Sequence, residues 1–187
     1  MATQKRIEQF IVAANNIGAE VFSATNLREA ANYVAERVTG PMLVPSFATG
    51  SRYKLKATLK KAGVTVASDL SRESAAQAQA GITGVNFAMA DTGTLALEST
   101  DEDIRLATTL PELQFALLDP EKILADSLAA VKPLRQLHQR DPRNYIAYIT
   151  GPSRTADIER VLTIGAHGAK ELHILLVPNL SSDPLEM

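Results

Sequence analysis

The chain has 187 residues, of which 45% are hydrophobic and 21% are charged, and its formal net charge is −2 at pH 7. This composition is typical of a globular protein, and the small negative charge argues against a nucleic-acid binder that depends on phosphate neutralisation. The sequence has no cysteine, which excludes disulfides, thiolate zinc sites, a cysteine nucleophile and Cys-ligated iron–sulfur clusters in this chain.

Hydrophobic periodicity over residues 1–80 predicts helices that alternate with short strands. Apolar residues recur at helical spacing over 3–16, and Gly18 follows as a stop. Asn26 is a suitable N-cap for a helix that reaches residue 38. The other elements predicted in this half are strands at 19–24, 42–45 and 64–67, a basic helix at 51–61 and a weak helix at 71–80.

The basic helix carries a cluster of cationic side chains. Their spacing favours the solvated face of a helix over an anion site. The cluster consists of Arg52, Lys54, Lys56, Lys60 and Lys61.

The pattern changes after residue 81. Between 82 and 118 it predicts strands without a clear helix, so we expect some antiparallel pairing there. Pro133 should kink or end the helix that follows. The predicted elements of this half are strands at 82–90, 94–99, 114–118, 145–150 and 172–177, helices at 123–138 and 155–164, and a frayed tail at 178–187.

Strands alternate with helices over most of the chain, which predicts an α/β fold with a mostly parallel sheet and helices on both faces. We expect one domain over 1–187, with the helix at 3–16 as a candidate appendage. No apolar run reaches the length of about 20 residues that a membrane span needs, and the N-terminus lacks the apolar block of a signal peptide. We therefore expect a cytoplasmic protein without a membrane span.

The segment Asp91-Thr92-Gly93-Thr94 separates two predicted strands. It is a turn signal, because Asp can bond its own backbone and Gly accepts positive φ. It could be a tight turn and nothing more. Alternatively, its N–H groups and threonine hydroxyls could bind a ligand, with Asp91 suited to accept a proton.

The segment Gly151-Pro-Ser-Arg-Thr-Ala-Asp157 carries the densest polar cluster of the chain. Ser153 or Thr155 could cap the predicted helix, or Ser153 and Arg154 could bind an anion at its N-terminus. Arg154 favours the second interpretation, since its guanidinium matches a carboxylate or phosphate. The predicted strands at 145–150 and 172–177 and the helix between them form one β-α-β unit. We therefore expect this cluster and His167 to gather at the carboxyl end of the sheet, where open α/β sheets bind ligands.

His167 lies between glycines and could shuttle a proton or cap a helix end. His167 and His173 lack the spacing of a metal pair, so no metal site is expected. The fingerprints of dinucleotide-binding folds, P-loops and nucleophile elbows are also absent from the sequence. The chain itself is therefore expected to hold no cofactor.

Four segments together resemble the LUD-domain family, specifically its lactate utilization protein C (LutC/YkgG-like) group. The resemblance covers residues 81–177, and its most specific part is the string at 153–159. The matching segments are Ala90–Thr94, Leu110–Pro111, Thr150–Glu159 and Gly165–His173.

This resemblance implies a three-layer α/β/α fold of the NagB/RpiA/CoA-transferase-like type. It also implies a role in the oxidation of L-lactate to pyruvate, as one component of a multi-protein system whose other members carry iron–sulfur clusters. A two-electron oxidation normally rests on a cofactor, so we expect a non-redox subunit that handles substrate or assembly.

Two alternatives remain open. One is a stand-alone isomerase or acyl transferase for a small phosphorylated or CoA-linked substrate, with Asp91 or Glu98 as base or nucleophile. The other is a non-catalytic module that binds a small organic acid. The predicted site has Asp91 and His167 as catalytic groups; its binding residues are Thr92, Gly93, Thr94, Ser153, Arg154, Thr155 and Asp157.

Overall fold

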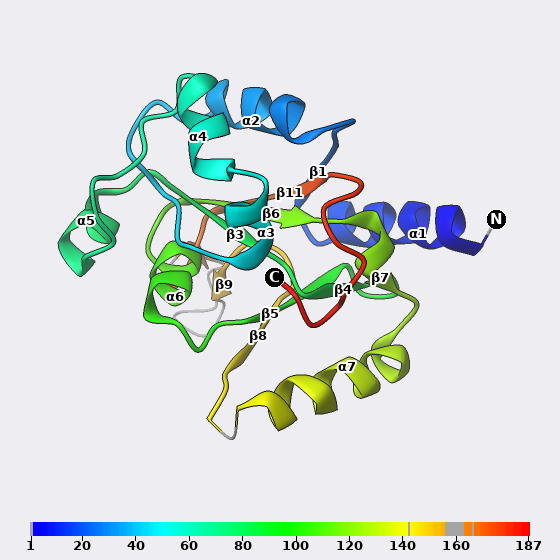
Figure 1. Cartoon of the computed structure of the whole chain (residues 1–187). Helices are drawn as coiled ribbons and strands as arrows, with labels where there is room; N and C mark the ends of the chain where they lie inside the picture. Colours follow the sequence, from blue (N-terminus) through cyan, green and yellow to red (C-terminus); the bar gives the residue numbers. More distant parts are fainter. Residues whose placement is uncertain (1, 142, 156–162, 166) are drawn as a thin grey trace.

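The computed structural model describes residues 2–141, 143–155, 163–165 and 167–187. Its centre is a sheet of five parallel strands (Figure 1). The inner strands are buried over almost their whole length, which is typical of a parallel sheet covered on both faces. In sheet order the strands are β1 (Glu20–Ser23), β11 (Glu171–Leu176), β6 (Leu113–Leu118), β3 (Ala80–Gly84) and β2 (Met42–Leu43).

One face of the central sheet is covered by α2 (Leu27–Ala35) and α4 (Leu55–Lys61) (Figure 1). Their apolar side chains pack against Phe115 and Leu117 of β6. Asn26 begins α2 as predicted, because its side chain accepts hydrogen bonds from two backbone N–H groups of the first turn.

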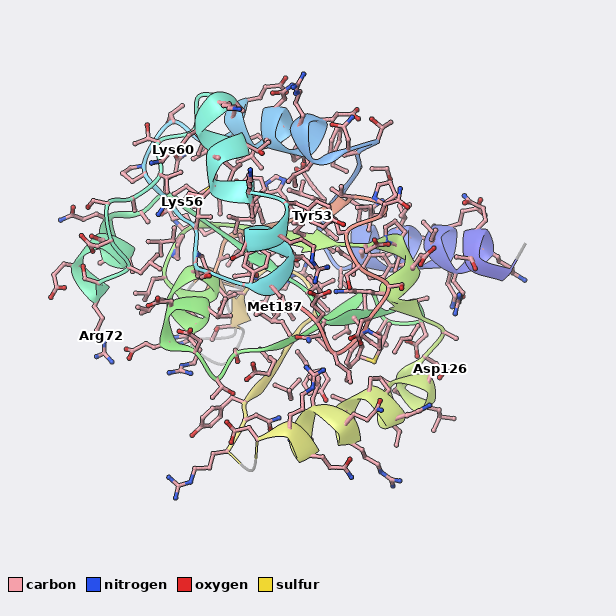
Figure 2. All side chains as sticks on the ribbon, in the orientation of Figure 1. Tyr53, Lys56, Lys60, Arg72, Asp126 and Met187 are labelled. Carbon is pink, nitrogen blue, oxygen red and sulfur yellow. The ribbon has the colours of Figure 1, made fainter. Side chains whose placement is uncertain are left out.

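The predicted helix at 51–61 is two helices. Lys54 has a left-handed φ of 54°, which interrupts the helical path between α3 (Ala48–Arg52) and α4. The cationic side chains of α4 point into solvent as expected, and Figure 2 shows Lys56 and Lys60 there.

The opposite face carries α1 (Ala2–Asn16) and α6 (Glu102–Thr109). Phe10 and Ala14 of α1 are fully buried in a core that includes apolar residues of β6 and β11. The N-terminal helix is therefore part of the core, and its prediction as an appendage was wrong. The pattern also gave no sign of α6, which lies so close to β3 that a Cβ on Gly81 would be 1.9 Å from the Ala107 carbonyl oxygen.

A second sheet lies below the central one, and α7 (Ser127–Arg140) covers its outer face (Figure 1). The pairing of β4 with β5 is antiparallel, which confirms the expectation for 82–118. Pro133 lies inside α7 and does not end it. In sheet order the strands are β7 (Ile123–Leu124), β4 (Phe87–Met89), β5 (Thr94–Glu98) and β8 (Ile146–Ile149).

Three predictions for the last third of the chain were wrong. β8 pairs antiparallel with β5 in the second sheet, so β8 and β11 do not form one β-α-β unit. The predicted helix at 155–164 has strands at both ends, β9 (Arg154–Thr155) and β10 (Thr163–Ile164), and its middle lies outside the described residues. Residues 178–187 are not frayed: the body of the molecule binds them through hydrogen bonds and ion pairs.

The remaining described helices are α5 (Arg72–Gln77) and the short 3₁₀ helix η1 (Pro120–Lys122). None of the helices described by the structure has both the length and the apolar character that crossing a membrane requires.

Candidate functional site

A cavity of about 430 Å³ lies at the amino ends of β6 and β11. The C-terminal end of α6 forms one side of it, and β8 with the turn that follows forms another. The polar cluster thus meets the amino ends of these parallel strands, not the carboxyl ends that we expected. The described lining residues are Thr108, Thr109, Gln114, Ala147, Tyr148, Ile149, Thr150, Gly151, Pro152, Ser153, Arg154, His167, Gly168, Ala169 and Leu172.

Gly151 begins the turn that carries the polar cluster. Its φ is 82°, and a Cβ at this position would lie 2.5 Å from the carbonyl oxygen of Ile17. Glycine is required here for both reasons, because another residue would be strained and would also clash. The turn therefore places Ser153 and Arg154 close to the C-terminal end of α1.

Ser153 joins the two predicted segments through its backbone. Its N–H donates to the Ala169 carbonyl, and its own carbonyl accepts from the Gly165 N–H, both at 2.9 Å. Its Oγ accepts from the backbone N–H of His167 at 3.4 Å. The hydroxyl hydrogen of Ser153 can still be donated to a ligand.

Arg154 supplies positive charge to the cavity. Its Nη2 donates to the Ile17 carbonyl at 2.5 Å. That acceptor is neutral, and a guanidinium has five N–H groups, so both charge and donors remain for an anion. Because no Asp or Glu stands among the described lining residues, this wall of the cavity favours a negatively charged ligand.

Gln114 is the polar residue that sequence reasoning missed. It is 3% exposed, lines the cavity, and has an amide nitrogen with no hydrogen-bond partner among the described residues. An unpaired buried donor costs about 1–3 kcal/mol. The signal in the sequence was a single polar residue within the apolar run at 113–118.

Tyr148 was also missed, and it stands at the rim of the cavity with a half-exposed side chain. Burial raises the pKa of its hydroxyl above the ordinary value of 10.0. The hydroxyl therefore remains protonated at neutral pH and can donate a hydrogen bond.

Asp91 does not line this cavity. Asp91 and Thr92 are exposed, and Asp91 lies beside Val12 and Asn16 in a shallow hollow on α1. Gly93 has a φ of 67°, and a Cβ there would lie 2.5 Å from the backbone nitrogen of Ala14. The turn is thus shaped for packing on α1, and its predicted role in binding a ligand has no support in this geometry.

Thr94 links the two predicted motifs indirectly. It is buried, and its Oγ1 lies 2.9 Å from Oγ1 of Thr150, which lines the cavity. Among the predicted site residues, the structure gathers Ser153, Arg154 and His167 in this cavity. Thr94 does not line the cavity but contacts it through Thr150. Thr155 follows in β9, where it pairs with Thr163 instead of capping a helix, and Asp157 lies outside the described residues.

No cluster of three or more His, Asp or Glu side chains suited to a metal ion occurs in the described part of the chain.

Comparisons with known proteins agree on one family. The model of the LUD domain matches residues 7–177. Lactate utilization protein C of Bacillus subtilis is 31% identical over 82% of this chain and 70% of its own length. Lactate utilization protein B of the same organism is 32% identical over 58% of this chain, but over 22% of its own length.

Two further comparisons give a relative in sequence and a relative in fold. An uncharacterized protein of Neisseria meningitidis is 38% identical over 52% of this chain and 42% of its own length, so the chain spans less than half of that relative. The crystal structure of a DUF162 family protein from Deinococcus radiodurans aligns with a TM-score of 0.64 over 94% of this chain and 96% of that one, at 16% identity, and therefore shares the α/β fold. The chain belongs to the LUD domain family.

Proposed function

We propose that the chain is a non-redox component of a multi-protein system that oxidises L-lactate to pyruvate in the cytoplasm. Support comes from the relatives named lactate utilization proteins B and C. Their names give no support to the alternative of a stand-alone isomerase or acyl transferase. Because this sequence has no cysteine for clusters, the proposal places iron–sulfur clusters on partner proteins.

The proposed role of the cavity is to bind a small organic acid. Arg154 would hold the carboxylate with two parallel N–H donors. The Ser153 hydroxyl and the Gln114 amide would then donate to the oxygen on the neighbouring carbon, which is a hydroxyl in lactate and a carbonyl in pyruvate. The observation that carries the proposal is the unpaired amide of Gln114 in the same cavity as an arginine that no described carboxylate neutralises.

His167 would handle the proton if the chain takes part in the chemistry. It is exposed at the cavity and stands beside the hydroxyl of Ser153 through its own backbone N–H. Imidazole is the side chain that most readily exchanges a proton near neutral pH.

Deletion of the gene in the native host tests the proposal. Growth on L-lactate should be lost and growth on pyruvate retained, because the proposed system acts between the two acids. An affinity-tagged copy should restore growth and should co-purify with an iron–sulfur protein from lactate-grown cells. Unchanged growth on L-lactate, or a tagged copy that restores growth and recovers no iron–sulfur partner, would contradict the proposal.

A further inference from the structure

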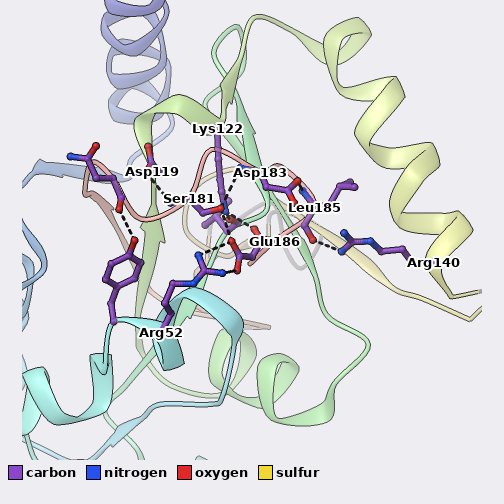
Figure 3. Close-up of polar contacts among 11 residues, drawn as sticks. Arg52, Asp119, Lys122, Arg140, Ser181, Asp183, Leu185 and Glu186 are labelled. Carbon is purple, nitrogen blue, oxygen red and sulfur yellow. Dashed lines mark hydrogen bonds and ion pairs between the residues drawn. The ribbon is translucent and has the colours of Figure 1, made fainter.

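The segment at 178–187 lies across the carboxyl ends of the central strands, at the opposite end of the sheet from the cavity with Ser153 and Arg154. Its main chain is bound much as a peptide ligand would be (Figure 3). The carboxylate of Asp119 accepts from the backbone N–H groups of Leu180 and Ser181 at 2.7 and 3.1 Å. The Arg140 guanidinium donates to the Leu185 carbonyl at 2.6 Å.

The side chain of Glu186 is held at the centre of this network. Arg52 makes a bidentate ion pair with both oxygens of the Glu186 carboxylate. The Ser181 hydroxyl donates to the same carboxylate at 2.6 Å. The Glu186 side chain is only 17% exposed. The hydroxyl of Ser181 and the guanidinium of Arg52 lower the pKa of this carboxyl group, so it stays ionised.

Lys122 lies directly beneath the segment and is 3% exposed. Its Nζ donates to the carbonyl oxygens of Val85 and Glu186 at 3.3 and 2.5 Å. Burial lowers its pKa to about 8, and the nearby carboxylates of Glu186 and Asp119 oppose that shift. At neutral pH the amine is therefore a buried cation that depends on nearby negative charge.

The charges of this network balance only while the segment is in place. Arg52, Lys122 and Arg140 contribute three positive charges, and Glu186, Asp183 and Asp119 contribute three negative charges. Of these carboxylates, only Asp119, whose oxygens accept from backbone N–H groups, lies outside the segment. If residues 182–187 moved away, one partly buried cation would lose its partner, which is costly in a protein interior. An anion from solution is the natural replacement.

We propose that Arg52 and Lys122, with the hydroxyl of Ser181, form a second binding site for a small carboxylate, and that Glu186 occupies it as an internal competitor. Asp119 keeps Leu180 and Ser181 in place while the residues after them swing out. A carboxylate fits the site because the occupant already is one and the fork of Arg52 grips both of its oxygens.

The site is independent of the proposed function. Its argument uses none of the residues of the first cavity, which lies at the opposite ends of the parallel strands. Sequence reasoning had assigned Arg52 to a solvated helix face, because the segment that reaches it begins 126 residues later with Pro178, a separation that no local pattern reveals.

The test is calorimetric titration with sodium pyruvate in an Arg154→Gln background, which removes the proposed first site. Glu186→Gln should raise the affinity for pyruvate at least tenfold, because a tethered carboxylate competes at an effective concentration of about millimolar. Arg52→Gln added to Glu186→Gln should abolish the gain. Arg140→Gln, which frees the Leu185 carbonyl without touching the site, should give a smaller gain in the same direction.

Glu102→Gln is the matched control, since Glu102 is also held by two nitrogens of an arginine, Arg72, but on the open surface. It should leave the pyruvate affinity unchanged. The proposal is overturned if Glu186→Gln and Arg140→Gln bring no gain, if Glu102→Gln brings the same gain, or if the gain survives Arg52→Gln. A gain for inorganic phosphate without one for pyruvate would refute the carboxylate assignment.

Discussion

The amide nitrogen of Gln114 and the hydroxyl oxygen of Thr83 are both buried without a hydrogen-bond partner among the described residues. Of these two residues, only Gln114 lines the cavity of Ser153 and Arg154. Natural proteins rarely keep such groups without a reason, because each lowers stability. For Gln114 the reason we propose is a ligand that satisfies the amide when it binds.

Replacing Gln114 by leucine should therefore stabilise the ligand-free protein by about 1 kcal/mol, since it removes an unpaired buried donor at similar volume. The free energy of unfolding from urea titration measures this. Thr83→Val is the matched control and should stabilise by a similar amount. A loss of more than about 1 kcal/mol in Gln114→Leu alone would mean that the amide has a structural partner.

How far single residues could be predicted depended on where their partners lie. Ser153, Arg154 and His167 were found because they belong to two short segments that the backbone of Ser153 joins. Gln114 and Tyr148 were missed because their chemistry depends on a cavity built from α6, β6 and β8. Asp91 has a side chain suited to catalysis, but its turn packs on α1, so the carboxylate lies beside that helix and outside the cavity.

At the scale of elements, the turn between β4 and β5 fits against α1 through Gly93. Gly93→Ala should cost about 2–5 kcal/mol of stability, because it combines a left-handed backbone with a clash against the backbone of Ala14.

Gly63 is the control for that variant. Its φ is 98°, but nothing lies within 4 Å of an added Cβ. Gly63→Ala should therefore cost only about 1–2 kcal/mol, from backbone strain alone. Thermal or urea unfolding compares the two variants. Equal losses would show that the turn does not need its close approach to α1.

Local signals predicted most of the elements. Asn26 caps α2, apolar runs became the inner strands of the central sheet, and the Asp-x-Gly turn joins an antiparallel pair. The sequence could not show which strands pair with each other. β8 has the composition of any half-buried strand, and it pairs with β5 instead of joining β11 in the central sheet. The helix α6 was missed because it is short and its contact with Gly81 is not local.

At the scale of the whole molecule, the parallel sheet separates two polar regions. The cavity with Arg154 lies at the amino ends of β6 and β11. The network around Glu186, drawn in Figure 3, lies at the carboxyl ends. The α/β class follows from the alternation of strands and helices. The sequence could not reveal which end of the sheet each polar segment would reach, because that depends on the second sheet and on a segment folded back from residue 178.

The central claim is that the cavity with Ser153, Arg154 and Gln114 binds a small organic acid. Calorimetric titration of the wild-type chain with L-lactate and with pyruvate tests it most directly. We expect saturable binding that weakens at least tenfold in Arg154→Gln, because a charge-assisted hydrogen bond is worth about 1.5–3 kcal/mol. Arg143→Gln, on an exposed arginine outside the cavity, should change nothing. Absence of binding to the wild type at millimolar acid, or equal affinity in Arg154→Gln, would contradict the claim.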